Sequence, residues 1–163
     1  MDTDGRALGA GALAGLVATG TMSAAMLVGQ RLGLLGESPP HRIADAALGV
    51  RGQRRGRGGA ALRNGLMATG HFGFGAALGA ALAALHRRVP APLGPIPRGL
   101  FAASLVWFVS YQGWVPALGL LPPVHRDRPG RPVTMLIAHW VYGATLGACL
   151  GRVGRQAFVR LRD

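Results

Sequence analysis

Charged residues are absent from four long stretches of this chain, which contain only apolar and small polar residues. No Asp, Glu, Lys or Arg lies within residues 7–30, 64–85, 99–121 or 133–151. A bilayer core of about 30 Å is crossed by a helix of about 20 residues. Because lipid offers no hydrogen bonds to the backbone, each stretch is predicted to be an α-helix. The pattern predicts an all-α integral membrane protein, a four-helix bundle in which residues 1–163 form a single membrane domain.

The second and fourth stretches contain related segments. Residues 71–82 read HFGFGAALGAAL and residues 139–150 read HWVYGATLGACL, and seven of these twelve positions are identical. In both halves the first helix is followed by Pro-Pro and then by His-Arg before the histidine helix begins. We therefore predict two parallel helix–loop–helix repeats, at residues 7–85 and 99–151, and a basic tail at residues 152–163.

The charge lies between the predicted spans. All 18 basic residues are arginine, and the formal net charge is +12. Arginines beside a membrane attract anionic lipid headgroups, at about 1 kcal/mol each, so a bilayer with anionic headgroups is the expected partner. The segment Arg51–Gly59 resembles an RGG-type sequence, but it has no aromatic residues for stacking on bases, so no nucleic acid is expected. The first connecting loop also contains a predicted surface helix, Ser38–Gly49, with an N-cap serine and a terminating glycine.

Small residues recur at every fourth position of the predicted spans. Such columns let helix backbones approach closely, which drives helix association in lipid. The glycines assigned to helix packing are Gly11, Gly15, Gly75, Gly79, Gly143, Gly147 and Gly151. These columns favour close contacts between helices, and they suit a protein that associates with a second copy or with a membrane partner protein.

Two histidines occupy equivalent positions within the repeat. His71 stands four residues before Gly75 and His139 four residues before Gly143, so both lie on the small-residue faces. An ionisable side chain within a membrane span indicates a functional site. One interpretation is structural, in which each neutral imidazole forms a hydrogen bond with a neighbouring helix. Another is a cofactor site, because two facing histidines above glycines are typical of b-type haem binding.

A metal site is a further alternative. His41 and His125 are expected on the same side of the membrane, and with His71 and His139 they would supply four imidazoles to a transition metal such as Zn or Cu. No carboxylate lies within a predicted span, which disfavours ion-coupled transport. Serines and histidines occur without a paired acid, so no catalytic residue is assigned.

The third predicted span is rich in aromatic residues. Trp107 and Tyr111 are four residues apart and are expected to pack against each other. Pro116 lacks a backbone donor and is expected to kink or end the helix near its position. In the loop that follows, Asp127 is expected to be a surface partner of Arg126.

Several segments together carry a family signal. They are Gly15–Ser23, Pro39–Ile43, Trp107–Pro116 and the two His-x-x-aromatic-Gly helices. These segments resemble the small uncharacterised bacterial inner-membrane proteins of the YagU-like type. The resemblance covers most of residues 8–150 and implies a multipass protein of the bacterial inner (plasma) membrane with no assigned chemistry.

Three functions are compatible with these observations. The leading hypothesis is a multipass, non-enzymatic membrane protein that acts through helix–helix association with itself or with a partner complex. One alternative is a b-type haem- or metal-binding redox protein that uses His71 and His139. The other is a small-solute channel or transporter, which would use the hydroxyl-rich first span.

Overall fold

Helices make up nearly all of the chain that the structure describes. The computed structural model describes residues 3–35, 57–88 and 92–159, so the predicted surface helix Ser38–Gly49 lies outside the described residues. The elements are α1 (Thr3–Arg31), α3 (Arg57–Arg88), α4 (Pro95–Val109), the π-helix η1 (Ser110–Trp114), α5 (Val115–Ala117), the 3₁₀-helix η2 (Val124–Arg126) and α6 (Arg131–Val159). No β-strand occurs within the described ranges, which confirms the all-α class.

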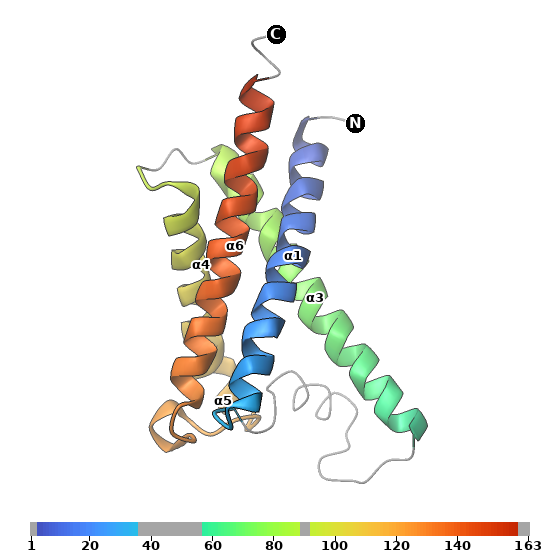
Figure 1. The fold of residues 1–163 in the computed structure, drawn as a ribbon, viewed down its shortest axis with the longest axis vertical. Helices are drawn as coiled ribbons and strands as arrows, with labels where there is room; N and C mark the ends of the chain where they lie inside the picture. The colour runs from blue at the N-terminus through green and yellow to red at the C-terminus, as the bar shows by residue number, and fades with distance from the viewer. Residues whose placement is uncertain (1–2, 36–56, 89–91, 160–163) are drawn as a thin grey trace.

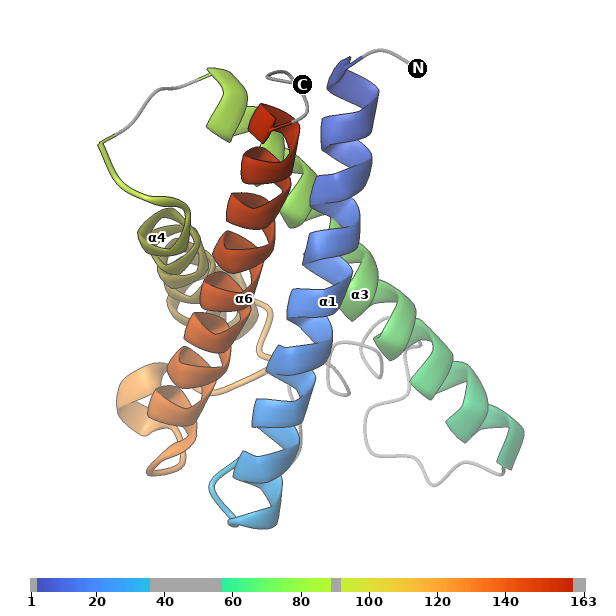
Figure 2. The ribbon, with the colours of Figure 1, turned by 45° about the horizontal axis from the view of Figure 1, so that its top comes forward.

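The long helical segments run alternately down and up the molecule, and both termini lie at the same end (Figure 1). α1 packs against both α3 and α6, and α4 packs against α6. In a tilted view, α4 and α1 lie on opposite sides of α6 (Figure 2). α6 is therefore held on two sides, whereas the main contacts of α3 are with α1 alone.

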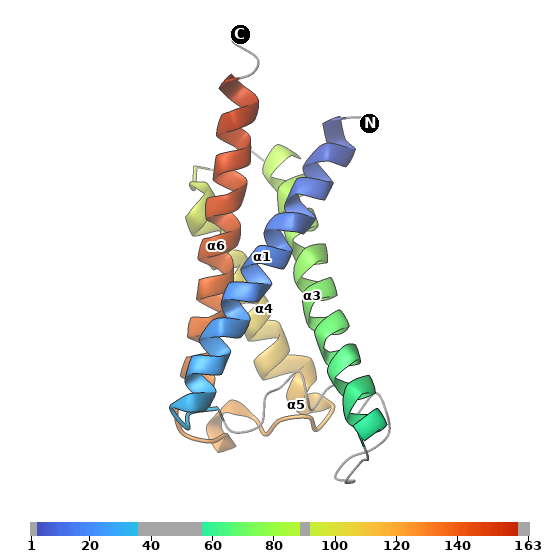
Figure 3. The same ribbon diagram turned by 45° about the vertical axis from the view of Figure 1, so that its right-hand side comes forward.

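The N-terminal half of α3 diverges from the other helices. α1 and α3 cross in the upper part of the molecule, and the lower part of α3 leads away from the bundle (Figure 3). Leu62 and Leu66 are exposed on this diverging part. Gly65 and Gly73 are exposed as well, and a Cβ atom added at either glycine would have no atom within 4 Å.

Three helices are long and apolar enough to cross a membrane. They comprise Asp4–Arg31, Asn64–His86 and Arg131–Val153. Each of them includes one of the predicted spans, which are residues 7–30, 64–85 and 133–151. α6 also continues as helix to Val159, well into the predicted basic tail.

The third predicted span, 99–121, has a composite structure. α4, η1 and α5 follow one another directly, so helical backbone extends from Pro95 to Ala117. Within η1 the hydrogen bonding changes, and the Val115 N–H donates to the Ser110 carbonyl five residues earlier. The missing N–H of Pro116 removes the next ordinary helical bond. The helix ends at Ala117, next to the proline as the sequence predicted, and Gly119 at φ +63° turns the chain away from the helix.

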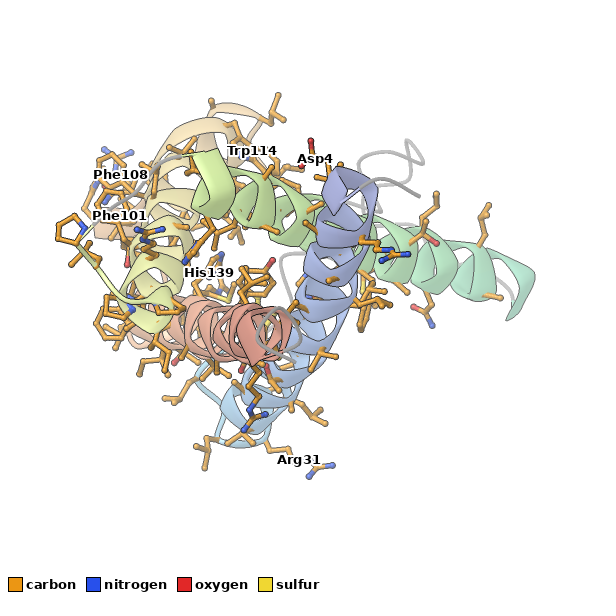
Figure 4. All side chains as sticks on the ribbon, turned by 90° about the horizontal axis from the view of Figure 1, so that it is seen from above. Asp4, Arg31, Phe101, Phe108, Trp114 and His139 are labelled. Atoms are coloured by element: carbon orange, nitrogen blue, oxygen red, sulfur yellow. The ribbon has the colours of Figure 1, made fainter. Side chains whose placement is uncertain are left out.

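Large apolar side chains cover the outside of the bundle. Leu13 on α1, Phe101 and Phe108 on α4, and Val133 on α6 are all well exposed, and Figure 4 shows both phenylalanines on the outer side of α4. The interior contains many small and aliphatic side chains, including the fully buried Ala18, Ala138 and Leu146, together with the buried Tyr111 and Tyr142. An apolar exterior of this extent is typical of a surface that contacts lipid or another protein.

Candidate functional site

The first close helix contact joins α1 to α3 through glycines. A Cβ atom added to Gly15 would lie 3.0 Å from Cα of Ala76 and would overlap the Gly75 carbonyl group. A Cβ atom added to Gly79 would lie 2.8 Å from Cα of Gly15, and one added to Gly11 would lie 2.6 Å from Cβ of Ala83. The two backbones therefore touch, and no larger residue fits at these positions.

The second close contact joins α4 to α6 in the same way. A Cβ atom added to Gly143 would lie 2.7 Å from the Gly99 carbonyl carbon, and one added to Gly147 would lie 2.6 Å from Cα of Ile96. Gly75 and Gly143 thus occupy matching places in the two helix pairs, as do Gly79 and Gly147. Gly151 lies one turn further along α6 and is partly exposed.

A small cavity lies where the two helix pairs meet. Its volume is about 80 Å³, and it is lined from all four helical segments by Thr19, Met22, His71, Phe74, Gly75, Leu78, Ala103, Val106, His139 and Tyr142. Figure 4, which views the molecule from above, shows His139 directed into the space between the helices. The two repeat histidines therefore face a common cavity, from α3 and from α6.

The two imidazoles differ in their hydrogen bonding. His139 donates from Nδ1 to the Met135 carbonyl oxygen at 2.7 Å, which leaves the lone pair of its other ring nitrogen, Nε2, available. His71 Nε2 is buried and has no hydrogen-bond partner among the described residues. A buried polar atom without a partner is unusual in a native protein and calls for an explanation.

Hydroxyl groups around the cavity are already engaged. The Tyr142 hydroxyl donates to the Gly75 carbonyl oxygen at 2.7 Å and so ties α6 to α3. The Thr19 hydroxyl donates to the Gly15 carbonyl oxygen within α1. The two histidines are therefore the side chains best able to bind a further molecule or ion here.

The four-histidine metal site is not assembled in the described part of the chain. His125 lies on η2, is exposed, and does not line the cavity, while His41 lies outside the described residues. No group of three or more His, Cys, Asp or Glu side chains suited to a metal ion occurs among the residues described. For haem, the cavity is small, since even drug-sized ligands occupy pockets of at least about 300 Å³.

A buried polar cluster at the loop end of the bundle was not predicted. Asp127 pairs with Arg131 at 2.7 Å, and its carboxylate also accepts a hydrogen bond from Tyr111. Arg131 in turn donates from Nε to the Leu35 carbonyl oxygen at 2.8 Å. The expectation that Asp127 pairs with Arg126 was wrong. Asp127 has an extended backbone and α6 begins only at Arg131, so the i, i+4 rule for residues within one helix gave no signal for this pair.

Sequence comparison places the chain in a family. A family model described as "Family of unknown function (DUF6789)" matches residues 5–159, so the chain belongs to that family. No curated protein matches the chain, and no solved structure matches it. The family carries no assigned activity, and the resemblance to YagU-like proteins and the bacterial origin that it implies stay predictions.

Proposed function

We propose that this member of the DUF6789 family is a non-enzymatic multipass membrane protein that pairs with a second copy of itself through the outer face of α3. Three helices of membrane-spanning length support insertion, and the helical segment from Pro95 to Ala117 adds a fourth crossing of similar length. The matching glycine contacts of α1 with α3 and of α4 with α6 support two helix–loop–helix repeats. From the YagU-like resemblance, we assign it to the bacterial inner membrane.

The observation that carries the proposal is a column of small residues on α3. Every fourth residue from 61 to 81 is small, and every one of them is exposed: Ala61, Gly65, Thr69, Gly73, Ala77 and Ala81. Twenty residues of helix are about 30 Å long, so the column is as long as the hydrocarbon core is thick. Small residues at this spacing are the typical contact surface between helices in lipid.

The matching face of α6 supports the same conclusion. When His71 is aligned with His139, Gly73 and Ala77 correspond to Val141 and Thr145. The Thr145 hydroxyl accepts a hydrogen bond from Thr21 at 3.1 Å, on the side of α6 that packs against α1. The part of the α3 column from Gly73 to Ala77 therefore matches a helix contact in the other half, whereas Gly65 and Thr69 match the exposed Val133 and Ile137. In α3 this face has no helix against it within the described residues.

A second copy is the partner that best fits this face. Two identical columns in a parallel arrangement are self-complementary, since each glycine admits the backbone of the other helix. Such a contact has two-fold symmetry and closes after two subunits, as most natural homodimers do. Small-residue columns packed in this way cross at about −40°. The crossing point is expected between Thr69 and Gly73, near the middle of the column.

Cysteine crosslinking in lipid vesicles tests the proposal. In a Cys149→Ala background, Gly73→Cys should form a disulfide-linked dimer on mild oxidation. Val17→Cys on α1 and Leu105→Cys on α4 are controls, because both side chains are exposed near the middle of their helices. Equal crosslinking at all three positions would indicate random collision, and no crosslinking at Gly73→Cys would overturn the proposal.

A further inference from the structure

The cavity between the helix pairs brings together three side chains that are ligands for soft metal ions. Met22 from α1, His71 from α3 and His139 from α6 all line it. The thioether of methionine and the imidazole of histidine both bind copper. The three ligands come from three different helices, so an ion bound to them would join the two halves of the molecule.

The hydrogen bonding of His139 is that of a metal ligand. Histidines that bind metals almost always donate their other ring N–H to a carboxylate or a backbone carbonyl, which fixes the ring and the tautomer. His139 does this through Nδ1 and the Met135 carbonyl oxygen. His71 contributes Nε2, a buried nitrogen with no hydrogen-bond partner among the described residues. An ion bound there would account for this unpaired atom.

The size of the cavity suits one ion shared by the two rings. The cavity volume of about 80 Å³ admits a metal ion but no large ligand. Two nitrogens that bind one metal ion at about 2 Å each are separated by about 4 Å when they lie on opposite sides of it. The cavity therefore has room for a single ion between the imidazoles, with the thioether as a third ligand.

The charge of the site selects the ion. No carboxylate or thiol lines the cavity, so the ligands supply no negative charge. With no negatively charged ligand to neutralise it, a divalent ion would bury two positive charges in apolar surroundings. The free-energy cost of burying an ion rises with the square of its charge. A soft monovalent ion is the better match, because thioether ligands select Cu(I). We propose that Met22, His71 and His139 form a binding site for Cu(I).

Anaerobic titration of the purified full-length protein in detergent with Cu(I), against a chromogenic Cu(I) chelator, tests this site. Cys149 is first replaced by Ala, because its thiol also binds Cu(I). One Cu(I) ion should bind per chain. His71→Leu and His139→Leu should each weaken binding by about a hundredfold or more, and Met22→Leu by about tenfold.

Matched substitutions serve as controls. Met26→Leu changes a buried methionine one turn further along α1, and His125→Ala changes an exposed histidine of η2, and neither residue lines the cavity. Both variants should bind Cu(I) as the parent does. If the parent binds no Cu(I), or if His125→Ala loses as much affinity as His71→Leu, the proposed site is wrong.

A spectroscopic measurement covers the case in which a variant fails to fold. X-ray absorption of the Cu(I)-loaded Cys149→Ala protein should show two nitrogen neighbours and one sulfur neighbour. Because that protein contains no thiol, a sulfur neighbour must come from methionine. A spectrum with nitrogen neighbours alone would exclude Met22 as a ligand and overturn the assigned ligand set.

Discussion

α3 and α6 contain the same histidine-to-glycine segment, yet their surroundings differ. α6 packs against α1 on one side and α4 on the other, whereas α3 has its main contacts with α1 only. The residues that touch a partner inside the bundle are alike in both, as the glycine contacts of Gly75 and Gly143 show. The residues of the exposed small-residue column of α3 differ from those at the corresponding positions of α6. Val133 and Ile137 of α6 are 61% and 49% exposed, and the corresponding residues of α3 are Gly65 and Thr69.

The ends of the two helices differ as well. α6 begins in a buried cluster, where Arg131 holds both Asp127 and the Leu35 carbonyl group. The described N-terminal part of α3 leads away from the bundle instead (Figure 1). The comparison teaches that glycine contacts hold both helix pairs together, and that the residues outside these contacts decide whether a helix is enclosed by the bundle.

The shared contact surface should be the least tolerant part of the molecule. Gly147→Leu and Gly79→Leu place a side chain where a Cβ atom would already overlap backbone of the neighbouring helix. Overpacking of this kind is expected to cost more than about 3 kcal/mol, so both variants should lose the folded bundle. Unfolding in detergent, followed by circular dichroism, measures this. Gly9→Leu is the control, because nothing lies within 4 Å of its Cβ position. Loss at only one of the two sites would break the equivalence of the helix pairs.

The anchored start of α6 should be the next most sensitive feature. Asp127→Ala leaves Arg131 buried without its carboxylate and leaves Tyr111 without its acceptor. Removal of one partner from a buried ion pair is expected to lower the free energy of unfolding by about 3 kcal/mol. Arg126→Ala, an exposed neighbour, should change it by less than about 0.5 kcal/mol. Similar losses in both variants would mean that the cluster does not anchor the helix.

Some of this arrangement could be read from the sequence. The charge-free windows located the helical segments, and the four-residue spacing identified Gly15, Gly75 and Gly143 as contact positions. The window of α3 began at residue 64, but the helix begins at Arg57, because charges mark the limits of hydrocarbon and not those of the helix. The sequence could not show which column of small residues packs against a neighbouring helix. Small residues at four-residue spacing line both the enclosed face and the exposed face of α3.

The residues that line the cavity could also be predicted only in part from the sequence. The equivalence of His71 and His139 predicted that they approach each other, and both line one cavity. Met22 carries no such signal, because a methionine in an apolar span has the pattern of any core residue. Its place beside the histidines depends on the packing of α1 against α3 and α6, which is a tertiary property.

The outer column of α3 should control pairing without affecting the fold. Gly73→Leu adds a side chain where no neighbouring atom lies within 4 Å, so the stability of the monomer should not change. The dimer should weaken by about tenfold or more, because the helices can no longer approach closely. Sedimentation equilibrium in detergent measures the dissociation constant. Val133→Leu, at an exposed position of the corresponding column of α6, should leave pairing unchanged, and equal weakening in both variants would remove the distinction between the two helices.

The two histidines should differ slightly in their contributions to stability when no metal is present. His139→Leu removes the bond to the Met135 carbonyl oxygen and should lower the free energy of unfolding by about 1 kcal/mol. His71→Leu removes a buried nitrogen that has no partner among the described residues, so stability should stay the same or rise. Denaturation of metal-free protein in detergent compares the two variants. A loss in His71→Leu as large as that in His139→Leu would mean that His71 has a structural bond, and the cavity would then hold two structural histidines.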